Sequence, residues 1–382
     1  MSIDECDQNR TALCPEDGKA LDCLENSCGN LLDCAGEKKR DGYFDLVKFF
    51  VLFFMLWGHA IQYCSIDFDF FGNPVFKAIY GFHMPLFALV SGWFFFFSVQ
   101  KYSFEYILKK KCLSMAFSIV SGNFLYWAFY VCIEIIRTKD TSIFVNGGWI
   151  DFLYGLWFLW AIMIAMAIVA FACKKVKNRI VSVLVVILGA VLFFVFPNSV
   201  LCIFVYPYFL IGFAACKYKD KLKKFAPLRF LSIPLYPLLV GFYRDDYYIY
   251  VSGLWGRGYS ALQLIGIDAY RFVTGVVGCV FVLTLAKPIF NLIKDKKICR
   301  VFADMGSKSL QVYVLQTIAY YVASVIVGDL ISRTEYCAFV NAHWQVYSFV
   351  ITFAFAILLY FLLYAITNVL YKTKIGKIVF GR

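Results

Sequence analysis

The sequence predicts an all-α fold: a polytopic transmembrane helical bundle of about ten membrane-spanning helices with both termini in the cytoplasm. The first observation is composition, because 62% of the 382 residues are hydrophobic and only 16% are charged, whereas about a quarter of a soluble domain is charged. The second is a series of apolar runs with the roughly 20 residues that a spanning helix needs. The third is that the basic residues behind the net charge of +12 form short clusters between these runs. Such clusters are a topology signal, so we expect the lipid bilayer and no nucleic acid as a partner.

The apolar runs divide the chain into ten predicted spans. One of them, 228–243, is short and contains Pro234 and Pro237, which cannot donate backbone hydrogen bonds. We expect this segment to be broken, tilted or re-entrant. The ten ranges are 43–64, 74–99, 112–136, 150–173, 179–196, 199–216, 228–243, 263–286, 309–328 and 346–371.

The distribution of Lys and Arg predicts the orientation. A cluster of Lys38, Lys39 and Arg40 precedes the first span, which places this end of the chain in the cytoplasm. With ten spans, most of the 37 Lys and Arg residues then lie on the cytoplasmic side. An odd number of spans would break this alternation, so the charges favour two cytoplasmic termini.

Three parts of the chain are expected. They are a polar, Cys-containing cytoplasmic tail over 1–40, a transmembrane domain over 41–372, and a short basic cytoplasmic tail over 373–382. The first tail lacks the apolar run of a secretory signal, and we expect it to be disordered and reduced. A thiolate metal site is the alternative, but the cysteine spacing differs from the paired C-x2-C pattern of zinc sites and no histidine is near. We therefore expect no metal at these thiols, which are Cys14, Cys23, Cys28 and Cys34.

The first predicted span carries two ionisable side chains at membrane depth. Lys48 and His59 are eleven residues apart, which places them on one helix face about 16 Å from each other. Asp45 lies one turn from Lys48 and can pair with it. Ionisable groups inside a membrane are costly and mark candidate functional sites. The alternatives are structural: Lys48 as an anchor reaching the interface, and His59 as a histidine bonded to a neighbouring helix.

The second predicted span contains another histidine, His83, two residues before Pro85. The two spans run antiparallel, so His59 and His83 are predicted at similar depths in the outer half, where both imidazoles can face one cavity. Imidazole accepts and returns protons near neutral pH, which suits acyl transfer. A packing role for His83, proton relay in a transporter and metal binding are the alternatives. Two histidines without a nearby carboxylate make a weak metal site, so we expect none.

Four segments match family motifs in order along the chain. They are Asp45-x-x-Lys48 with His59; Phe82-His83-Met84-Pro85-Leu86-Phe87 followed by Ser91-Gly92; Leu156-Trp157-Phe158-Leu159; and Met305-Gly306-Ser307-Lys308-Ser309-Leu310-Gln311-Val312-Tyr313. With these motifs the chain resembles the acyltransferase-3 family of membrane-bound sugar O-acyltransferases, and most closely its fucose 4-O-acetylase-like branch. The motifs extend over nearly all of the predicted membrane part.

The resemblance implies an O-acyltransferase of the cell membrane, and the subgroup implies a bacterial source. Acetyl-CoA or another acyl-CoA would be the co-substrate, with no permanently bound cofactor. The acceptor would be a sugar hydroxyl of a cell-envelope glycan or of its lipid-linked precursor. His59 would be the catalytic residue and Lys48 its basic partner, with His83 and Ser91 lining the site. Many relatives have a histidine where this chain has Gln316, and glutamine cannot titrate.

Further residues are candidates for substrate binding. The cluster Lys109, Lys110 and Lys111 lies at the predicted cytoplasmic rim, where ammonium groups can hold the phosphates of acyl-CoA. Trp157 belongs to the third motif, and Arg257 and Arg271 lie toward the outer face, where they can contact a sugar or a diphosphate. For the loop that contains Arg257, the alternative to substrate binding is simple anchoring at the membrane interface.

The sequence leaves the mechanism and two other functions open. His59 can act as a base for direct attack on the thioester, or be acylated itself. A transporter or flippase of glycan precursors would also have many short-looped spans with histidines at membrane depth. Such transporters often show paired broken helices, whereas only one candidate, around Pro234 and Pro237, is present here. A membrane sensor or scaffold would leave Lys48 and His59 without a role.

Overall fold

The computed structural model describes residues 41–65, 68–146, 155–195, 199–244, 247, 258–330, 333–374 and 376. Every regular element within these ranges is a helix, which confirms the predicted all-α class. The described residues from Tyr43 onward belong to one compact unit. The predicted tail 1–40 and most of 373–382 lie outside the described residues.

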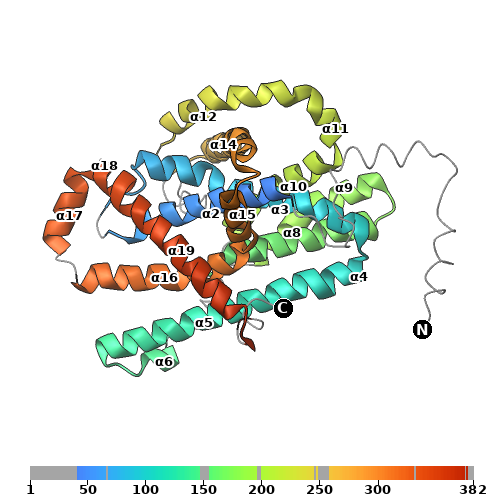
Figure 1. The fold of residues 1–382 in the computed structure, drawn as a ribbon. Coiled ribbons are helices and arrows are strands. Elements are labelled where there is room, and N and C mark those ends of the chain that lie inside the picture. Colours follow the sequence, from blue (N-terminus) through green and yellow to red (C-terminus); the bar gives the residue numbers. More distant parts are fainter. Residues whose placement is uncertain are drawn as a thin grey trace. The chain divides into compact units, whose positions relative to one another are not determined.

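Eight helices in the described part of the chain are long and apolar enough to cross a membrane (Figure 1). Their positions agree with eight of the ten predicted ranges, and they confirm a polytopic membrane bundle. Six are formed by α2 (Gly42–Tyr63), α3 (Pro74–Lys101), α8 (Trp157–Lys174), α10 (Ser199–Lys217), α14 (Ala261–Ile293) and α16 (Ser309–Leu330). Two are continuous runs, one of α4 (Phe104–Tyr106), η2 (Ile107–Cys112) and α5 (Leu113–Thr138), the other of α18 (Trp344–Val346), η7 (Tyr347–Ile351) and α19 (Thr352–Leu370).

The other two predicted ranges form shorter or irregular helices. Range 179–196 contains α9 (Arg179–Leu188) and the 3-10 helix η3 (Gly189–Val195). Range 228–243 contains the end of the 3-10 helix η4 (Lys223–Leu231) and the ten-residue α12 (Ser232–Gly241), which follow α11 (Lys219–Leu222). Prolines inside η4 and α12 remove donors from the helical ladder, which accounts for the irregular geometry. The total of ten spans stays a prediction.

Short helices connect the spans, namely α6 (Ile143–Asn146), α15 (Lys297–Ser307) and α17 (Arg333–Ala342). Helix α15 precedes α16 and brings Gly306 against the first turns of α2, where an added Cβ would lie 1.9 Å from the Asp45 carbonyl oxygen. The late Gly-containing motif of the sequence therefore packs on the helix that carries Lys48.

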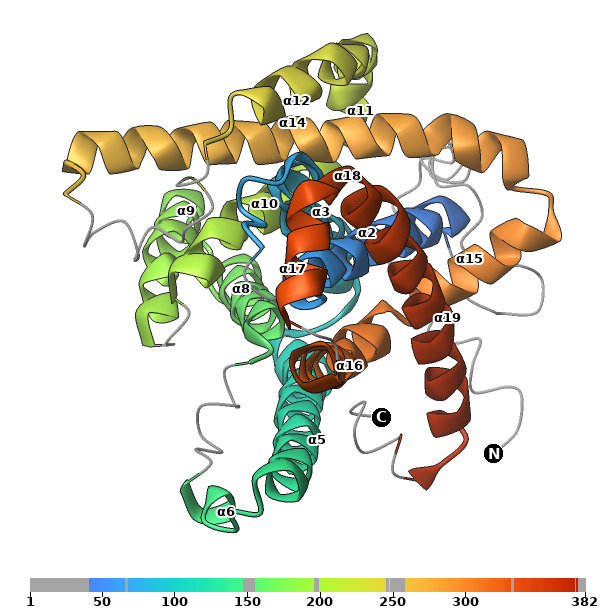
Figure 2. The same cartoon turned by 90° about the vertical axis from the view of Figure 1, so that its left-hand side faces the viewer.

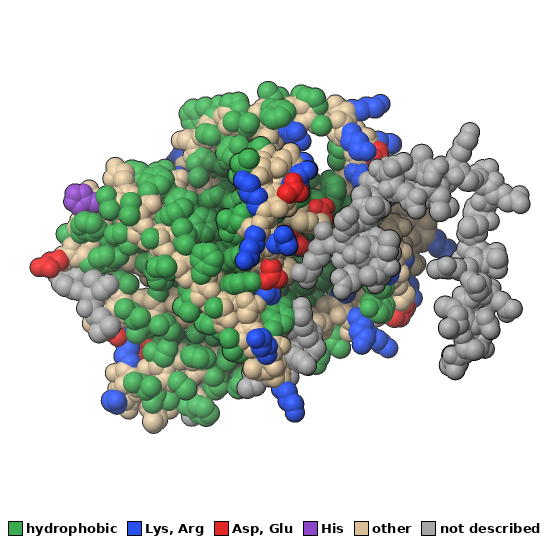
Figure 3. Space-filling view, in the orientation of Figure 1, with side chains coloured by type: hydrophobic (Ala, Val, Ile, Leu, Met, Phe, Trp, Pro, Cys, Tyr) green, Lys and Arg blue, Asp and Glu red, His purple; other side chains and the backbone are tan. Residues whose placement is uncertain are grey.

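Large apolar side chains cover much of the described surface (Figure 3). Phe124 of α5 is 64% exposed, Leu262 of α14 is 79% exposed and Leu358 of α19 is 70% exposed. Extended apolar surface of this kind is unusual on a soluble monomer. Lipid is the solvent that suits it, in agreement with a multi-pass membrane protein.

Helices α3 and α10 make the closest backbone contact near the site, and they lie side by side in Figure 1 and Figure 2. A Cβ added to Gly92 of α3 would lie 1.9 Å from the Phe209 carbonyl oxygen, and one added to Gly212 of α10 would lie 1.9 Å from that of Leu89. Only glycine permits this approach, and small residues play this part at membrane helix interfaces. The contact sets the spacing of two helices that line the site.

Helix α2 is held around His59 by hydrogen bonds from later helices. The Tyr320 hydroxyl of α16 donates to the Leu56 carbonyl at 2.5 Å. The Trp57 indole N–H donates to the Ser348 carbonyl of η7 at 2.8 Å. Both partners on α2 lie within one turn of His59, so these bonds define the position of its backbone.

Candidate active site

A cavity of about 470 Å³ opens among α2, α3, α5, α8, α10, α14 and α16. Its size is that of a small-molecule site. Five residues that the sequence analysis selected from five separate elements line it together. They are His59, His83, Trp157, Arg271 and Gln316.

His59 is linked to two residues that the sequence analysis did not select. The Tyr80 hydroxyl of α3 lies 2.9 Å from His59 Nδ1 and donates to Gln62 Oε1 at 3.0 Å. Gln62 is one turn after His59 on α2, and Tyr80 is one turn before His83 on α3. The motif spacing therefore contained a signal for both, but the contact across the two helices is visible only in the structure.

One tautomer of His59 satisfies this chain of hydrogen bonds as it is drawn. With the single proton of the Tyr80 hydroxyl in the bond to Gln62 Oε1, the bond between Tyr80 and His59 is donated by His59 Nδ1–H. In a neutral ring Nε2 then keeps its lone pair, which can accept a proton. A base whose second nitrogen is held by an orienting group is the arrangement that acid–base catalysis requires.

His83 is buried beside this group, with 2% of its surface exposed. Its Nδ1 lies 3.0 Å from the Ile79 carbonyl oxygen, and because a carbonyl only accepts, Nδ1–H is the donor. The Tyr80 ring meets the His83 ring edge-on, with centroids 4.6 Å apart. His83 thus lines the cavity in a fixed orientation and shares Tyr80 with His59 as a neighbour.

Gln316, a candidate of the sequence analysis, lies on α16. It is buried, and its Oε1 has no hydrogen-bond partner among the described residues. Buried polar atoms normally have partners. An unpartnered amide oxygen on a cavity wall is suited to accept a hydrogen bond from a bound ligand.

Arg271 of α14 lines the cavity with only 7% of its side chain exposed. Its guanidinium lies over the Phe204 ring, 4.4 Å from the centroid, and Nη1 lies 3.3 Å from Asp268 Oδ1. Its buried Nε–H has no hydrogen-bond partner in the described part of the chain. The side chain is therefore held in place with one donor still free.

Aromatic side chains form much of the cavity wall. Seven of them are tyrosines, which combine a flat apolar ring with a hydroxyl. The ring of Tyr320 lies 5.6 Å from that of His59, centroid to centroid. The seven are Tyr63, Tyr80, Tyr126, Tyr243, Tyr313, Tyr320 and Tyr321.

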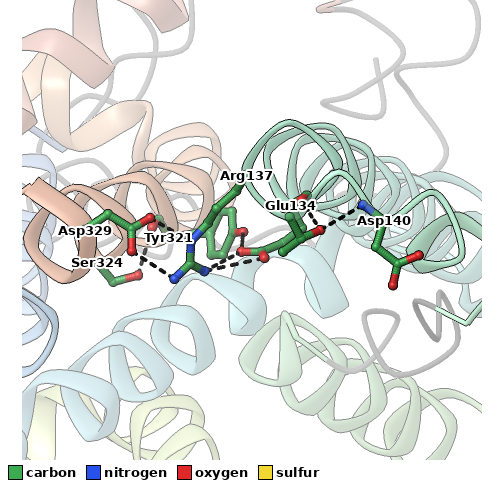
Figure 4. Close-up of polar contacts among 7 residues, drawn as sticks. Glu134, Arg137, Asp140, Tyr321, Ser324 and Asp329 are labelled. Carbon is green, nitrogen blue, oxygen red and sulfur yellow. Dashed lines mark hydrogen bonds and ion pairs between the residues drawn. The ribbon is translucent and has the colours of Figure 1, made fainter.

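A polar network joins the C-terminal parts of α5 and α16 beside the cavity (Figure 4). Arg137 contacts Glu134 on its own helix at 3.1 Å and Asp329 of α16 at 2.6 Å. The Tyr321 hydroxyl donates to Glu134 at 2.5 Å, and the Ser324 hydroxyl donates to the Tyr321 carbonyl at 2.8 Å. Since Tyr321 and Ser324 line the cavity, this network helps to set one of its walls.

Lys48 and Ser91, which the sequence analysis also selected, do not line this cavity. Lys48 Nζ lies 2.9 Å from Asp45 Oδ1 and 4.8 Å from the centroid of the Phe94 ring. The Ser91 hydroxyl donates to the Phe87 carbonyl one turn earlier, at 2.8 Å. A serine in a membrane helix commonly bonds in this way, which satisfies its hydroxyl without a ligand.

The lysine cluster also lies away from the cavity lining, in η2. Lys109 and Lys110 are exposed. Lys111 is half-buried, with Nζ 2.5 Å from the Ser98 hydroxyl oxygen. Two of the three ammonium groups are therefore presented to the surroundings. Arg257 lies outside the described residues.

Comparison with known proteins adds the family. The family model described as an acyltransferase domain matches residues 41–367. Two relatives are both named nodulation protein NolL: one from Sinorhizobium fredii is 30% identical over 47% of this chain and 50% of its own length, and one from Mesorhizobium japonicum is 27% identical over 47% and 48%. The chain thus aligns with about half the length of these curated relatives, and no solved structure matches. Because the family model extends over most of its length, the chain belongs to the acyltransferase-3 family.

Proposed function

We propose that the chain transfers an acyl group, acetyl or another short acyl, from acyl-CoA to a sugar hydroxyl bound in the cavity beside His59. The observation that carries this proposal is the hydrogen-bonded chain His59–Tyr80–Gln62 on a cavity wall, in a member of an acyltransferase family. The acceptor would be a glycan of a bacterial cell envelope or its lipid-linked precursor. The rhizobial source of both relatives supports a bacterial cell membrane.

His59 acts as a general base in this proposal. Nε2 takes the proton of the acceptor hydroxyl while the hydroxyl oxygen attacks the thioester carbonyl carbon. The C–S bond of the tetrahedral intermediate then breaks, and the proton passes from Nε2 to the leaving thiolate. Tyr80 and Gln62 hold the ring through Nδ1–H in both steps. In the second route that the same position allows, Nε2 attacks the thioester carbon and the C–S bond breaks to release the CoA thiolate. The sugar hydroxyl then attacks the acyl-histidine, its proton passes to the thiolate, and the bond from the acyl carbon to Nε2 breaks.

The developing oxyanion needs hydrogen-bond donors placed in advance. The amide group of Gln316 lies on the same cavity as His59 and is the candidate for this task, because its N–H groups donate without a change of charge. A neutral His83 ring lines the cavity but is not a donor to the oxyanion, since its one N–H is used in the bond to the Ile79 carbonyl.

The acyl donor is proposed to approach along α2. Lys48 and His59 lie on this one helix, separated by about 16 Å along its axis. Lys48 and the exposed ammonium groups of Lys109 and Lys110 would hold the phosphates of acyl-CoA on the cytoplasmic side. The thioester at the end of the pantetheine arm would then reach the cavity.

Tyrosine-rich walls support a sugar as the acceptor. A sugar ring has apolar C–H faces and a polar edge, and tyrosine offers an apolar ring with a hydroxyl at its tip. The cavity has seven such residues. Its unpartnered Gln316 Oε1 adds an acceptor for a sugar hydroxyl.

Transfer from radiolabelled acetyl-CoA tests the proposal. The purified full chain in liposomes is given an envelope-glycan extract from a deletion strain, and label in the glycan is counted. We expect transfer by the wild type, loss of at least about 100-fold in His59→Ala, and wild-type transfer in His343→Ala, because His343 is exposed and outside the cavity lining. Absence of transfer by folded wild-type protein, with varied extracts, would contradict the proposal and favour glycan transport.

A further inference from the structure

The charge of Arg271 is not balanced inside the cavity. Arg271 lies ten residues into α14, about 15 Å along the helix axis. Only 7% of its side chain is exposed. A buried guanidinium at membrane depth is costly and normally has a full set of partners. Here the described lining of the cavity contains no aspartate and no glutamate.

The protein partners of Arg271 satisfy it only in part, although the Tyr243 side chain, which also lines the cavity, is hydrogen-bonded to it. Asp268 is the carboxylate paired with it, at 3.3 Å, and it is 42% exposed and outside the cavity lining. The guanidinium carbon lies over the Phe204 ring, 4.4 Å from its centroid, a cation–π contact that adds no hydrogen-bond acceptor. The buried Nε–H has no hydrogen-bond partner among the described residues.

We infer that Arg271 binds an oxyanion group of the acceptor, so that the substrate class is an anionic sugar bearing a phosphate ester or a carboxylate. The planar fork of arginine matches both groups in a bidentate manner. A charged group on the acceptor would supply the negative charge that the lining lacks and would accept from Nε–H. This inference rests on the proposed function, because it names the acceptor of the same cavity.

Titration with three small probes tests the inference on the full chain in lipid nanodiscs. The probes are glucose 1-phosphate, glucuronate and glucose, measured by isothermal titration calorimetry without any acyl donor. We expect at least one charged probe to bind about tenfold or more tightly than glucose, because hydrogen bonds to charged groups are the stronger ones. The two charged probes distinguish phosphate from carboxylate as the preferred group.

Variants assign the preference to Arg271. Arg271→Gln should lose the preference for a charged probe over glucose, and Arg271→Lys should keep part of this preference. Asp268→Asn should strengthen the preference several-fold by removing a competing carboxylate. Arg244→Gln is the matched control, since Arg244 is exposed and outside the lining, and it should keep the preference. An unchanged thermal unfolding temperature confirms that each variant is folded.

Two results would overturn the inference. One is equal binding of charged and neutral probes by the wild type, and the other is a charge preference that persists in Arg271→Gln. A raised KM for acyl-CoA in Arg271→Gln would assign the anion to the donor and would also refute it. His59→Ala keeps these readings separate from the proposed function, because it should bind the charged probe as the wild type does while transferring no acyl group.

Discussion

Removal of the Tyr80 hydroxyl is the sharpest test of the hydrogen-bonded chain at His59. In Tyr80→Phe the ring stays, together with its stacking on Phe76 at 3.8 Å and its edge-on contact with His83 at 4.6 Å. The ring also stays beside Gly58 of α2, where an added Cβ would lie 2.8 Å from Tyr80 Cε2. Only the oxygen that bridges His59 and Gln62 is lost, so the change isolates orientation of the base from packing.

The size of the effect follows from the two bonds that disappear. They measure 2.9 Å to His59 Nδ1 and 3.0 Å to Gln62 Oε1. Hydrogen bonds between neutral groups each contribute about 0.5–1.5 kcal/mol, so the pair contributes about 1–3 kcal/mol. Because about 1.4 kcal/mol corresponds to a factor of ten in rate, kcat should fall about 5- to 150-fold. KM for donor and acceptor should change little, since in the structure the hydroxyl is bonded to protein groups.

Release of free CoA in the presence of the glycan extract measures the rate, and varying each substrate separates kcat from KM. Tyr206→Phe is the matched control: it also removes a buried tyrosine hydroxyl, which donates to the Val186 carbonyl at 2.9 Å, but outside the cavity lining. If Tyr80→Phe has the kcat of the wild type, or loses no more than Tyr206→Phe, the role given to the Tyr80 hydroxyl is wrong.

Three further outcomes are expected. The double change Lys109→Gln and Lys110→Gln should raise the KM for acyl-CoA several-fold with kcat little changed, and an unaltered KM would remove both lysines from donor binding. Lys48→Met should raise the same KM about tenfold, whereas Lys48→Arg should restore most of it; equal behaviour of the two variants would leave Lys48 with a structural role only. Gly92→Ala should cost about 1–3 kcal/mol of stability, because its Cβ would overlap a backbone oxygen. Thermal unfolding would show this against Gly266→Ala, where nothing lies within 4 Å of the new Cβ.

The class of fold and eight spans were readable from the sequence because hydropathy and charge act locally. The 3-10 geometry of η4 precedes Pro234 and Pro237, which both lie inside the α-helix α12, so a broken, tilted or re-entrant segment at 228–243 stays a prediction. Whether that segment and α9 complete a set of ten spans depends on their tilt and neighbours. Hydropathy along one chain does not contain that information.

The candidate site was readable only in part. His59 and His83 stood out because ionisable groups are rare at membrane depth, and the structure places both on one cavity. Tyr80 and Gln62 did not stand out, since uncharged polar residues are common at helix interfaces. Ser91 was selected by its motif, but its hydroxyl bonds within its own helix. Spacing along a helix does not predict which of these bonds a side chain makes across to another helix.

The two sides of the cavity should respond differently when the protein is extracted from its membrane. On the side formed by α3 and α10, the two backbones are in direct contact at Gly92 and Gly212. Detergent leaves this van der Waals packing intact. The side formed by α5 and α16 depends in part on Arg137, whose side chain is 40% exposed and paired with Asp329 at 34%, and ion pairs of this kind weaken as ionic strength rises. Solubilised protein can therefore keep its helix content and still lose one wall of its site. Low salt and retained native lipid are the conditions under which the cavity should survive purification.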